Sequence, residues 1–229
     1  MKKILLTGTA LLFSASTIFA QSTMSGSDAR IGIKGGVNLS TVKYSGFDGA
    51  SSLNDATKQN VGYNFTVFGD FGVGNNFFIQ PGISLQNKGT KFEGTFAGIT
   101  GEQTINVMAI EVPVNAVLRI PTGQSGAFQL SAGPYAAFNV DGKRKTKITS
   151  GTNQGTTEEN LKFGNDADDD GTSMDFGANF GVGYRMNSGF MLGANYGMGL
   201  SNLVPKDARD GNDSKATNRV WGFSVGYSF

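Results

Sequence analysis

Two residue types with wide chemical uses, cysteine and histidine, are absent from this chain. Without cysteine it can form no disulfide framework, and it has no lipid-attachment cysteine after a leader. Without histidine it lacks the commonest general base and the commonest transition-metal ligand. A hydrolase or acyltransferase would have nothing of this kind to activate a serine or polarise a water molecule. We therefore expect a non-enzymatic protein without a cofactor.

Charge and proline are also scarce. Charged residues make up 16% of the chain, the net charge is +1 and there are 5 prolines. This balance predicts no general attraction to nucleic acid. Glycine is abundant instead, with 34 residues, and aromatic residues reach 11%. Such a composition is typical of a barrel rich in glycine and aromatic residues, and unlike that of a helical bundle.

The first twenty residues have the layout of a secretory signal peptide. Lys2 and Lys3 precede an apolar stretch, and Ala20 ends a small-residue cleavage site. The apolar stretch is shorter than the roughly 20 residues that a membrane-spanning helix requires, and no later stretch approaches that length without polar interruption. We predict a signal peptide over residues 1–20 and one exported domain over residues 21–229.

Apolar and polar residues alternate along the exported part with a period of two, which indicates half-buried β-strands. The C-terminal segment is the clearest case, because Trp221, Phe223, Val225, Tyr227 and Phe229 share one face. Eight segments show the pattern, at residues 31–39, 61–73, 77–86, 108–120, 128–139, 174–185, 190–201 and 220–229.

Alternation alone does not say which face lies inside. A lipocalin-like barrel would turn its apolar face inward and would need a charged exterior for solubility. Here the polar face is mostly Gly, Ser, Asn and Gln, which suits a narrow lumen better than a solvated surface. We therefore favour an apolar exterior in contact with lipid. The charged residues then predicted to lie in the lumen are Lys34, Asp70, Glu111, Arg119, Asp175 and Arg185.

Short and long connections alternate along the chain. Residues 74–76, 121–126 and 187–189 have turn chemistry, whereas residues 41–58, 88–103, 141–171 and 202–218 form long polar stretches. This is expected when one barrel end faces the periplasm and the other the exterior. The prediction is an all-β, eight-stranded, antiparallel up-and-down transmembrane barrel of the outer membrane. Its long loops would be extracellular, and its short turns and both termini periplasmic.

Several short motifs, taken in order, resemble the PorT-like outer-membrane β-barrel family common in Bacteroidota, a porin-like group. They lie at residues 31–40, 78–82, 86–89, 110–113, 132–135, 175–177 and 197–202. The resemblance implies an outer-membrane location and about eight strands. It also implies that the barrel-assembly machinery reads the terminal strand, with Trp221, Phe223, Tyr227 and Phe229 as the assembly signal.

Two loop motifs could bind ligands. Asp166, Asp168 and Asp170 match the opening of an EF-hand calcium loop, but Gly177 stands where the closing glutamate belongs, so a solvated acidic loop is the alternative. A basic cluster could contact lipopolysaccharide phosphates, or simply form a solvated loop base. It consists of Lys143, Arg144, Lys145 and Lys147.

Function is less constrained than fold. Eight strands enclose an interior only just filled by side chains, so the charged lumen residues favour a plugged barrel. Such a barrel would be a structural or surface-interaction protein, with outer-membrane lipids and lipopolysaccharide as partners and an extracellular or envelope protein partner that the sequence does not identify. The alternative is a narrow porin-like channel for ions or small solutes.

Overall fold

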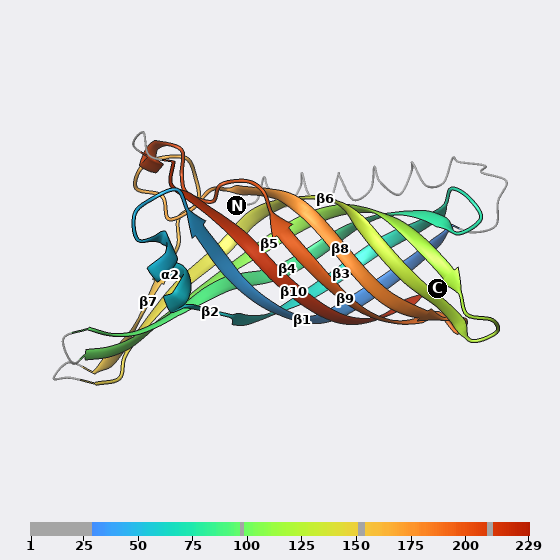
Figure 1. Cartoon of the computed structure of the whole chain (residues 1–229), viewed down its shortest axis with the longest axis horizontal. Helices are drawn as coiled ribbons and strands as arrows, with labels where there is room; N and C mark the ends of the chain where they lie inside the picture. The colour runs from blue at the N-terminus through green and yellow to red at the C-terminus, as the bar shows by residue number, and fades with distance from the viewer. Residues whose placement is uncertain (1–28, 97–98, 151–153, 210–212) are drawn as a thin grey trace, which may run out of the picture.

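The structure, a computed structural model, is a closed antiparallel β-barrel (Figure 1). It describes residues 29–96, 99–150, 154–209 and 213–229. The ring runs β1–β3–β4–β5–β6–β8–β9–β10 and closes between β10 and β1. Its eight strands are β1 (Arg30–Ser45), β3 (Asn60–Gly72), β4 (Phe77–Phe96), β5 (Ile99–Pro121), β6 (Gly126–Ile148), β8 (Met174–Met186), β9 (Phe190–Gly199) and β10 (Lys215–Ser228). This confirms the predicted eight-stranded antiparallel barrel, and each alternating segment lies mainly within one of these strands.

Closure of the ring removes the sheet edges that an open sheet would expose. β1 and β10 pair from Gly32↔Ser228 to Ser45↔Lys215. The alternating C-terminal segment is thus the closing strand of the barrel.

The two ends of the barrel differ in their connections. Residues 73–76, 122–125 and 187–189 make short turns at the end where the C-terminus lies (Figure 1), and Gly123 and Gly189 there adopt positive φ of 76° and 91°. The opposite, loop-side end carries the long connections. They contain α2 (Ala50–Ala56), β2 (Thr57–Lys58), β7 (Gly155–Asn160) and the 3-10 helix η1 (Asp207–Arg209).

The predicted long loops are too long: residues 41–45 belong to β1, 141–148 to β6 and 215–218 to β10, and one predicted loop is mostly strand. Of residues 88–103, expected to be a polar loop, 88–96 continue β4 and 99–103 belong to β5, and the two strands pair as far as Phe96↔Ile99. With β6 and β7 they form a long extension that projects beyond the ring on the loop side (Figure 1). We call this sheet, made of residues 89–96, 99–106, 142–148 and 155–160, the tongue.

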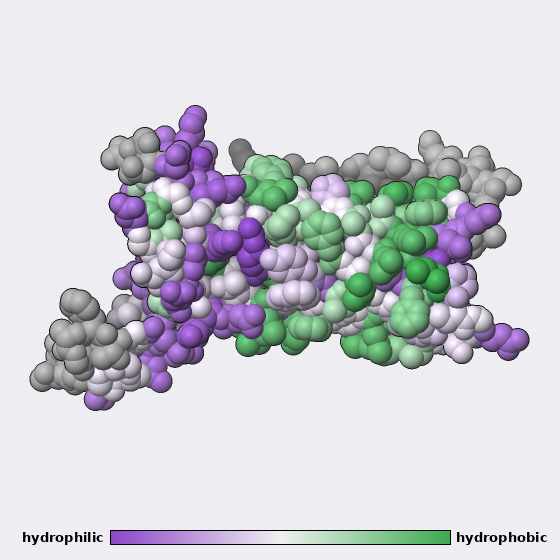
Figure 2. Space-filling model, in the orientation of Figure 1, coloured by the Kyte–Doolittle hydropathy of each residue, from purple (hydrophilic) through white to green (hydrophobic). Residues whose placement is uncertain are grey.

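The barrel exterior carries a band of exposed apolar side chains (Figure 2). Within it, Phe180 is 47% and Leu192 46% exposed. Aromatic pairs lie toward each side of the band: Tyr196 with Trp221, ring centres 4.9 Å apart, and Phe128 with Tyr184, 5.1 Å apart. Aromatic girdles of this kind border the lipid-facing zone of membrane barrels. The apolar face therefore lies outside, as predicted, and the lipocalin-like alternative is wrong.

On the loop side the polarity of the strands inverts. In β1, Val42 and Tyr44 share the inward parity of the buried Asn38, whereas Lys43 lies on the exterior. β6 makes the change with a bulge. Met108 pairs with Asp141 but Ala109 pairs with Asn139, which leaves Val140 as an extra residue.

None of the helices in the described residues has the length and apolarity to cross a membrane. The predicted signal peptide, residues 1–20, lies outside the described residues.

Candidate functional site: the polar lumen and its surroundings

A charged cluster lies inside the barrel. Lys88 of β4 places its ammonium 2.6 Å from a carboxylate oxygen of Glu111 on β5 and 3.9 Å from one of Asp175 on β8. The same ammonium lies 4.6 Å from the ring centre of Tyr135 on β6, whose hydroxyl donates to Asp175 at 3.1 Å. We call Lys88, Glu111, Asp175 and Tyr135 the lumen cluster. All four residues are at most 5% exposed.

Neutral side chains complete the hydrogen bonding of its two carboxylates. Asn179 donates to Glu111 at 3.1 Å, and Asn218 and Ser201 donate to Asp175 at 2.8 and 2.9 Å. A buried charge is tolerated only when it is paired and hydrogen-bonded in this way. The cluster joins β4, β5, β6, β8 and β10 across the lumen, and so braces the barrel from within.

A second ion pair lies nearer the short turns. Arg119 of β5 pairs with Asp70 of β3, which is fully buried and also accepts a hydrogen bond from Gln80 at 3.0 Å. The guanidinium stacks 3.7 Å above the centre of the Phe78 ring. With the oxygen of its amide turned toward Arg119, Gln129 accepts from Nε at 2.8 Å. Carboxylate, amides and ring together fill this level of the lumen.

The remaining predicted lumen residues are less buried. Lys34 and Arg185 are both half-buried, on β1 and β8. Among the described residues no carboxylate lies within ion-pair distance of Lys34, and its ammonium lies 5.8 Å from the centre of the Phe68 ring. The structure thus brings Glu111 together with Asp175, and Asp70 together with Arg119. Lys34 lies between these two levels, where it lines two small lumen cavities.

These cavities have volumes of about 60 and 50 Å³. The lining of the first includes small residues such as Ser131, Gly181 and Ser224, and the second reaches Lys88 and Glu111. A space of this size holds a few water molecules, since one molecule needs about 10 to 15 Å³ measured in this way. The lumen is therefore largely filled by side chains.

Sequence reasoning missed several residues that fill the lumen. Lys88 was assigned to a loop, although it has the same parity as the inward-facing Ser84 and Gln86 of the same strand. Tyr135 and Phe68 face inward despite their size. Phe68 fits because its ring occupies the space where a side chain at Gly32 would stand. The alternation of faces along each strand could have placed Lys88 and Tyr135 in the lumen. Phe68 is apolar, and an apolar side chain is expected on the lipid-facing exterior of the barrel.

The structure divides the predicted basic cluster between two faces. After the bulge at Val140, Lys143, Lys145 and Lys147 are exposed, whereas Arg144 turns inward and pairs with Asp170 at 2.6 Å. Lys145 lies 3.4 Å from Glu158 of β7. The four cations therefore do not form a single patch.

The predicted calcium loop is held together by other contacts. Asp170 accepts hydrogen bonds from Arg144 and from the amide of Lys162, whereas Asp168 faces the Lys162 ammonium at 3.5 Å. Burial opposes ionisation of Asp170, but these hydrogen bonds outweigh it and hold the pKa of the carboxyl below its usual value. Over the described residues, no group of three or more acidic side chains is arranged to hold a metal ion.

Three residues of the proposed assembly signal lie on the exterior of β10, and Phe229 directly follows that strand. Trp221, Phe223, Tyr227 and Phe229 are 42% to 69% exposed. The Tyr227 and Phe229 rings meet edge to face, 5.1 Å apart, at the short-turn end.

A barrel with an apolar exterior and a charged, side-chain-filled interior is the architecture of an outer-membrane protein. The sequence profile of the outer membrane protein beta-barrel domain matches residues 19–204. The chain belongs to this family. The barrel domain is therefore an outer-membrane protein domain.

Solved structures of other outer-membrane barrels are similar to this barrel domain. The attachment invasion locus protein Ail of Yersinia pestis, in complex with the heparin analogue sucrose octasulfate, is 18% identical over 88% of this chain and 99% of its own, with a TM-score of 0.41. Neisserial surface protein A is 12% identical over 88% and 99%, with a TM-score of 0.39. OprG of Pseudomonas aeruginosa is 12% identical over 88% and 96%, with a TM-score of 0.37. No curated protein matches the sequence.

Proposed function

We propose that this protein is a small outer-membrane barrel with a plugged lumen, which acts as a structural or surface-interaction protein of the envelope. The observation that carries the proposal is the lumen cluster. Lys88, Glu111 and Asp175 are buried and paired with one another, and their neighbours Asn179 and Asn218 lie against them. A conducting pore would need water-filled space at this level, whereas these side chains occupy it.

Single-channel recording in planar bilayers tests the plug. The wild-type protein should show no steady conductance, and Glu111→Ala with Lys88→Ala should create one, because the double variant removes both side chains that cross the lumen. Asn106→Ala, on the outer face of the same strand, is the matched control and should stay silent. A steady conductance of the wild type would overturn the proposal.

The alternative function is a narrow channel for ions or small solutes. It is favoured by Lys34, which lines both lumen cavities and has no carboxylate within ion-pair distance among the described residues. If the lumen conducts, Lys34→Gln should change the ratio of anion to cation permeability. An unchanged ratio in a conducting protein would exclude Lys34 from the path.

The proposed orientation places the loop-side end and the tongue outside the cell, and both termini in the periplasm. It rests on the contrast between long loops and short turns. Because the chain has no cysteine, Ser45→Cys should be labelled by an impermeant maleimide on intact cells and Ser188→Cys should not. The reverse result would invert the barrel. At the loop side, Lys143, Lys145 and Lys147 would meet lipopolysaccharide phosphates.

Insertion is proposed to depend on the barrel-assembly machinery, with Trp221, Phe223, Tyr227 and Phe229 as the recognised face. The motifs resembling the PorT-like family support this role. Deleting Phe229 should lower the amount of folded, heat-modifiable protein in the membrane and leave export intact. An unchanged yield of folded protein would show that these residues are lipid-facing surface without a specific role as an assembly signal.

A further inference from the structure

A cavity of about 220 Å³ lies inside the loop-side end of the barrel. It lies where the strands have already inverted their polarity, so apolar side chains form much of its wall. Val42 of β1, Ile105 and Val107 of β5 and Ala216 of β10 line it from the barrel. Their side chains are half-buried or buried, as in a core that is incompletely filled.

Two long connections cover this cavity. Phe163 and Leu161 pack against β6 at Gly142, where an added side chain would meet both of them. The amide of Thr172 donates to Leu203 at 3.1 Å, and that of Leu203 donates to Ala216 at 2.8 Å, so the two connections are joined to each other and to the barrel wall. We call this space the mouth cavity, bounded by the residues named here.

The charges around the mouth cavity are already neutralised. Arg144 pairs with Asp170, and Lys88 at the inner end pairs with Glu111 and Asp175. A charged ligand would have to compete with these pairs. An uncharged ligand would not.

One polar atom of the wall has no partner. Thr90 of β4 lines the cavity and is 1% exposed, and its Oγ1 makes no hydrogen bond among the described residues. A buried hydroxyl without a partner costs free energy, which a ligand able to hydrogen-bond would recover.

From these observations we propose that the mouth cavity binds a small, uncharged, mainly apolar molecule with one hydrogen-bonding group, which Thr90 Oγ1 contacts. An apolar cavity of about 150 Å³ in another protein accommodates benzene, so this one is large enough for a substituted aromatic ring. The site goes beyond the plugged-barrel function and does not depend on it. It requires only the loop-side cavity.

The test uses 4-fluorophenol and fluorobenzene as probes, with ¹⁹F NMR of the full barrel in lipid nanodiscs. 4-Fluorophenol should bind the wild type above its partitioning into empty nanodiscs. Thr90→Val, which replaces the hydroxyl by a methyl of similar size, should weaken its binding about fivefold, the worth of one hydrogen bond, and leave fluorobenzene unaffected. Thr104→Val is the matched control, because Thr104 lies outside on the neighbouring strand, beside Lys91.

A second variant fills the space instead of changing its polarity. Ala216→Leu should abolish binding of both probes, since its extra carbons occupy the cavity. Binding of 4-fluorophenol that is equal in the wild type, Thr90→Val and Ala216→Leu would overturn the site. Binding no greater than in empty nanodiscs would show that the cavity holds only water, and would overturn it too.

Discussion

The lipid-facing part of the barrel and its loop-side end are built from the same strands with opposite polarity. In the first, Phe180 and Leu192 face outward while Glu111 and Asp175 are buried in the lumen. In the second, Val42 and Val107 face inward while Lys43 and Lys91 face outward. Strand alternation is the same in both regions. What differs is the solvent, lipid around one and water around the other, and the solvent decides which face is apolar.

The largest expected effect compares a lysine in each region. Lys88→Ala leaves Glu111 without its ion-pair partner in the lumen and should lower the free energy of unfolding by about 3 to 5 kcal/mol. Lys91→Ala removes an exposed pair with Glu93 and Glu102 and should change it little. Urea unfolding in lipid vesicles, followed by the fluorescence of the single Trp221, measures both. Equal effects would mean that the lumen cluster is not a brace.

The second largest effect is expected from a charge placed on the exterior of the lipid-facing part, compared with the same charge on the exterior of the loop-side end. Phe180→Arg puts a charge within the apolar band and should cost up to about 2 to 4 kcal/mol, because lipid cannot solvate the guanidinium. Thr104→Arg, on the exterior of the tongue, should fold normally since water covers that surface. The yield of folded protein in isolated membranes checks this comparison. Similar yields for both variants would place Phe180 outside the lipid.

The bulge provides a third test. Deleting Val140 should restore uninterrupted alternation in β6, turning Lys143 inward and Arg144 outward. The tongue should then lose its structure while the lipid-facing ring remains. Limited proteolysis of inserted protein would show new cleavage within residues 142–160. Val140→Thr, which keeps the residue count, is the control, and cleavage in that variant alone would contradict the interpretation.

A smaller effect concerns Asp170, which anchors the connection over the mouth cavity. Because the pKa of its carboxyl is lowered in the folded state, its contribution is complete above the usual value of 3.8 and is lost as the pH falls through the lower, folded-state pKa. Asp170→Asn should therefore increase hydrogen exchange in residues 161–172 at neutral pH and make no difference in strong acid. The same increase at both pH values would exclude its ionisation as the cause.

Much of the fold could be predicted because alternation depends only on local sequence. All eight strands follow from it, and the turns follow from short glycine- and asparagine-containing connections. The limits of the strands could not be predicted on the loop side. From Asn87 to Lys91 polar residues occupy both faces, because this segment crosses from the lipid-facing pattern to the inverted one, and the pattern there resembles that of a loop.

The candidate site was harder to predict than the fold. Asp70, Glu111, Arg119 and Asp175 were placed in the lumen by polarity, but their pairing depends on register between strands, which the sequence does not show. Strand alternation separates Arg144 from Lys143 and Lys145, but which of them faces inward depends on a single unpaired residue, Val140. Phe68 faces inward only because Gly32 leaves room for its ring.

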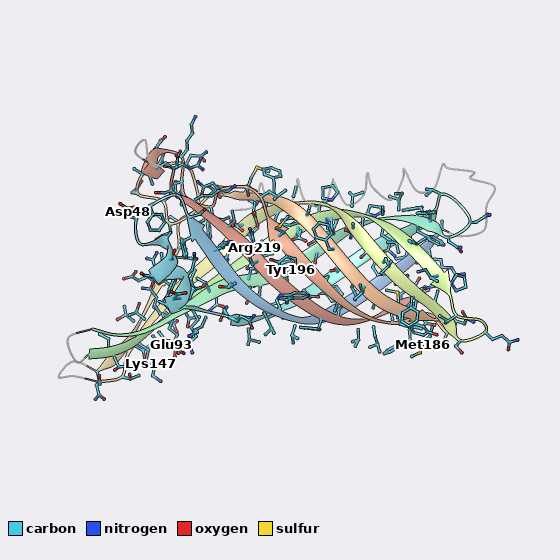
Figure 3. The ribbon with its side chains drawn as sticks, in the orientation of Figure 1. Asp48, Glu93, Lys147, Met186, Tyr196 and Arg219 are labelled. Atoms are coloured by element: carbon cyan, nitrogen blue, oxygen red, sulfur yellow. The ribbon has the colours of Figure 1, made fainter. Side chains whose placement is uncertain are left out.

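The length of the tongue determines which of its charges can interact electrostatically with the membrane surface. β4 continues eight residues past Lys88, from Gly89 to Phe96, a path of about 26 Å at 3.3 Å per residue. The Debye length at physiological ionic strength is only about 8 Å. Figure 3 labels Glu93 and Lys147 along this sheet, and Glu93 lies five residues past Lys88. If the tongue faces the exterior, its far end lies beyond the electrostatic reach of the lipid surface and is available to molecules approaching from solution.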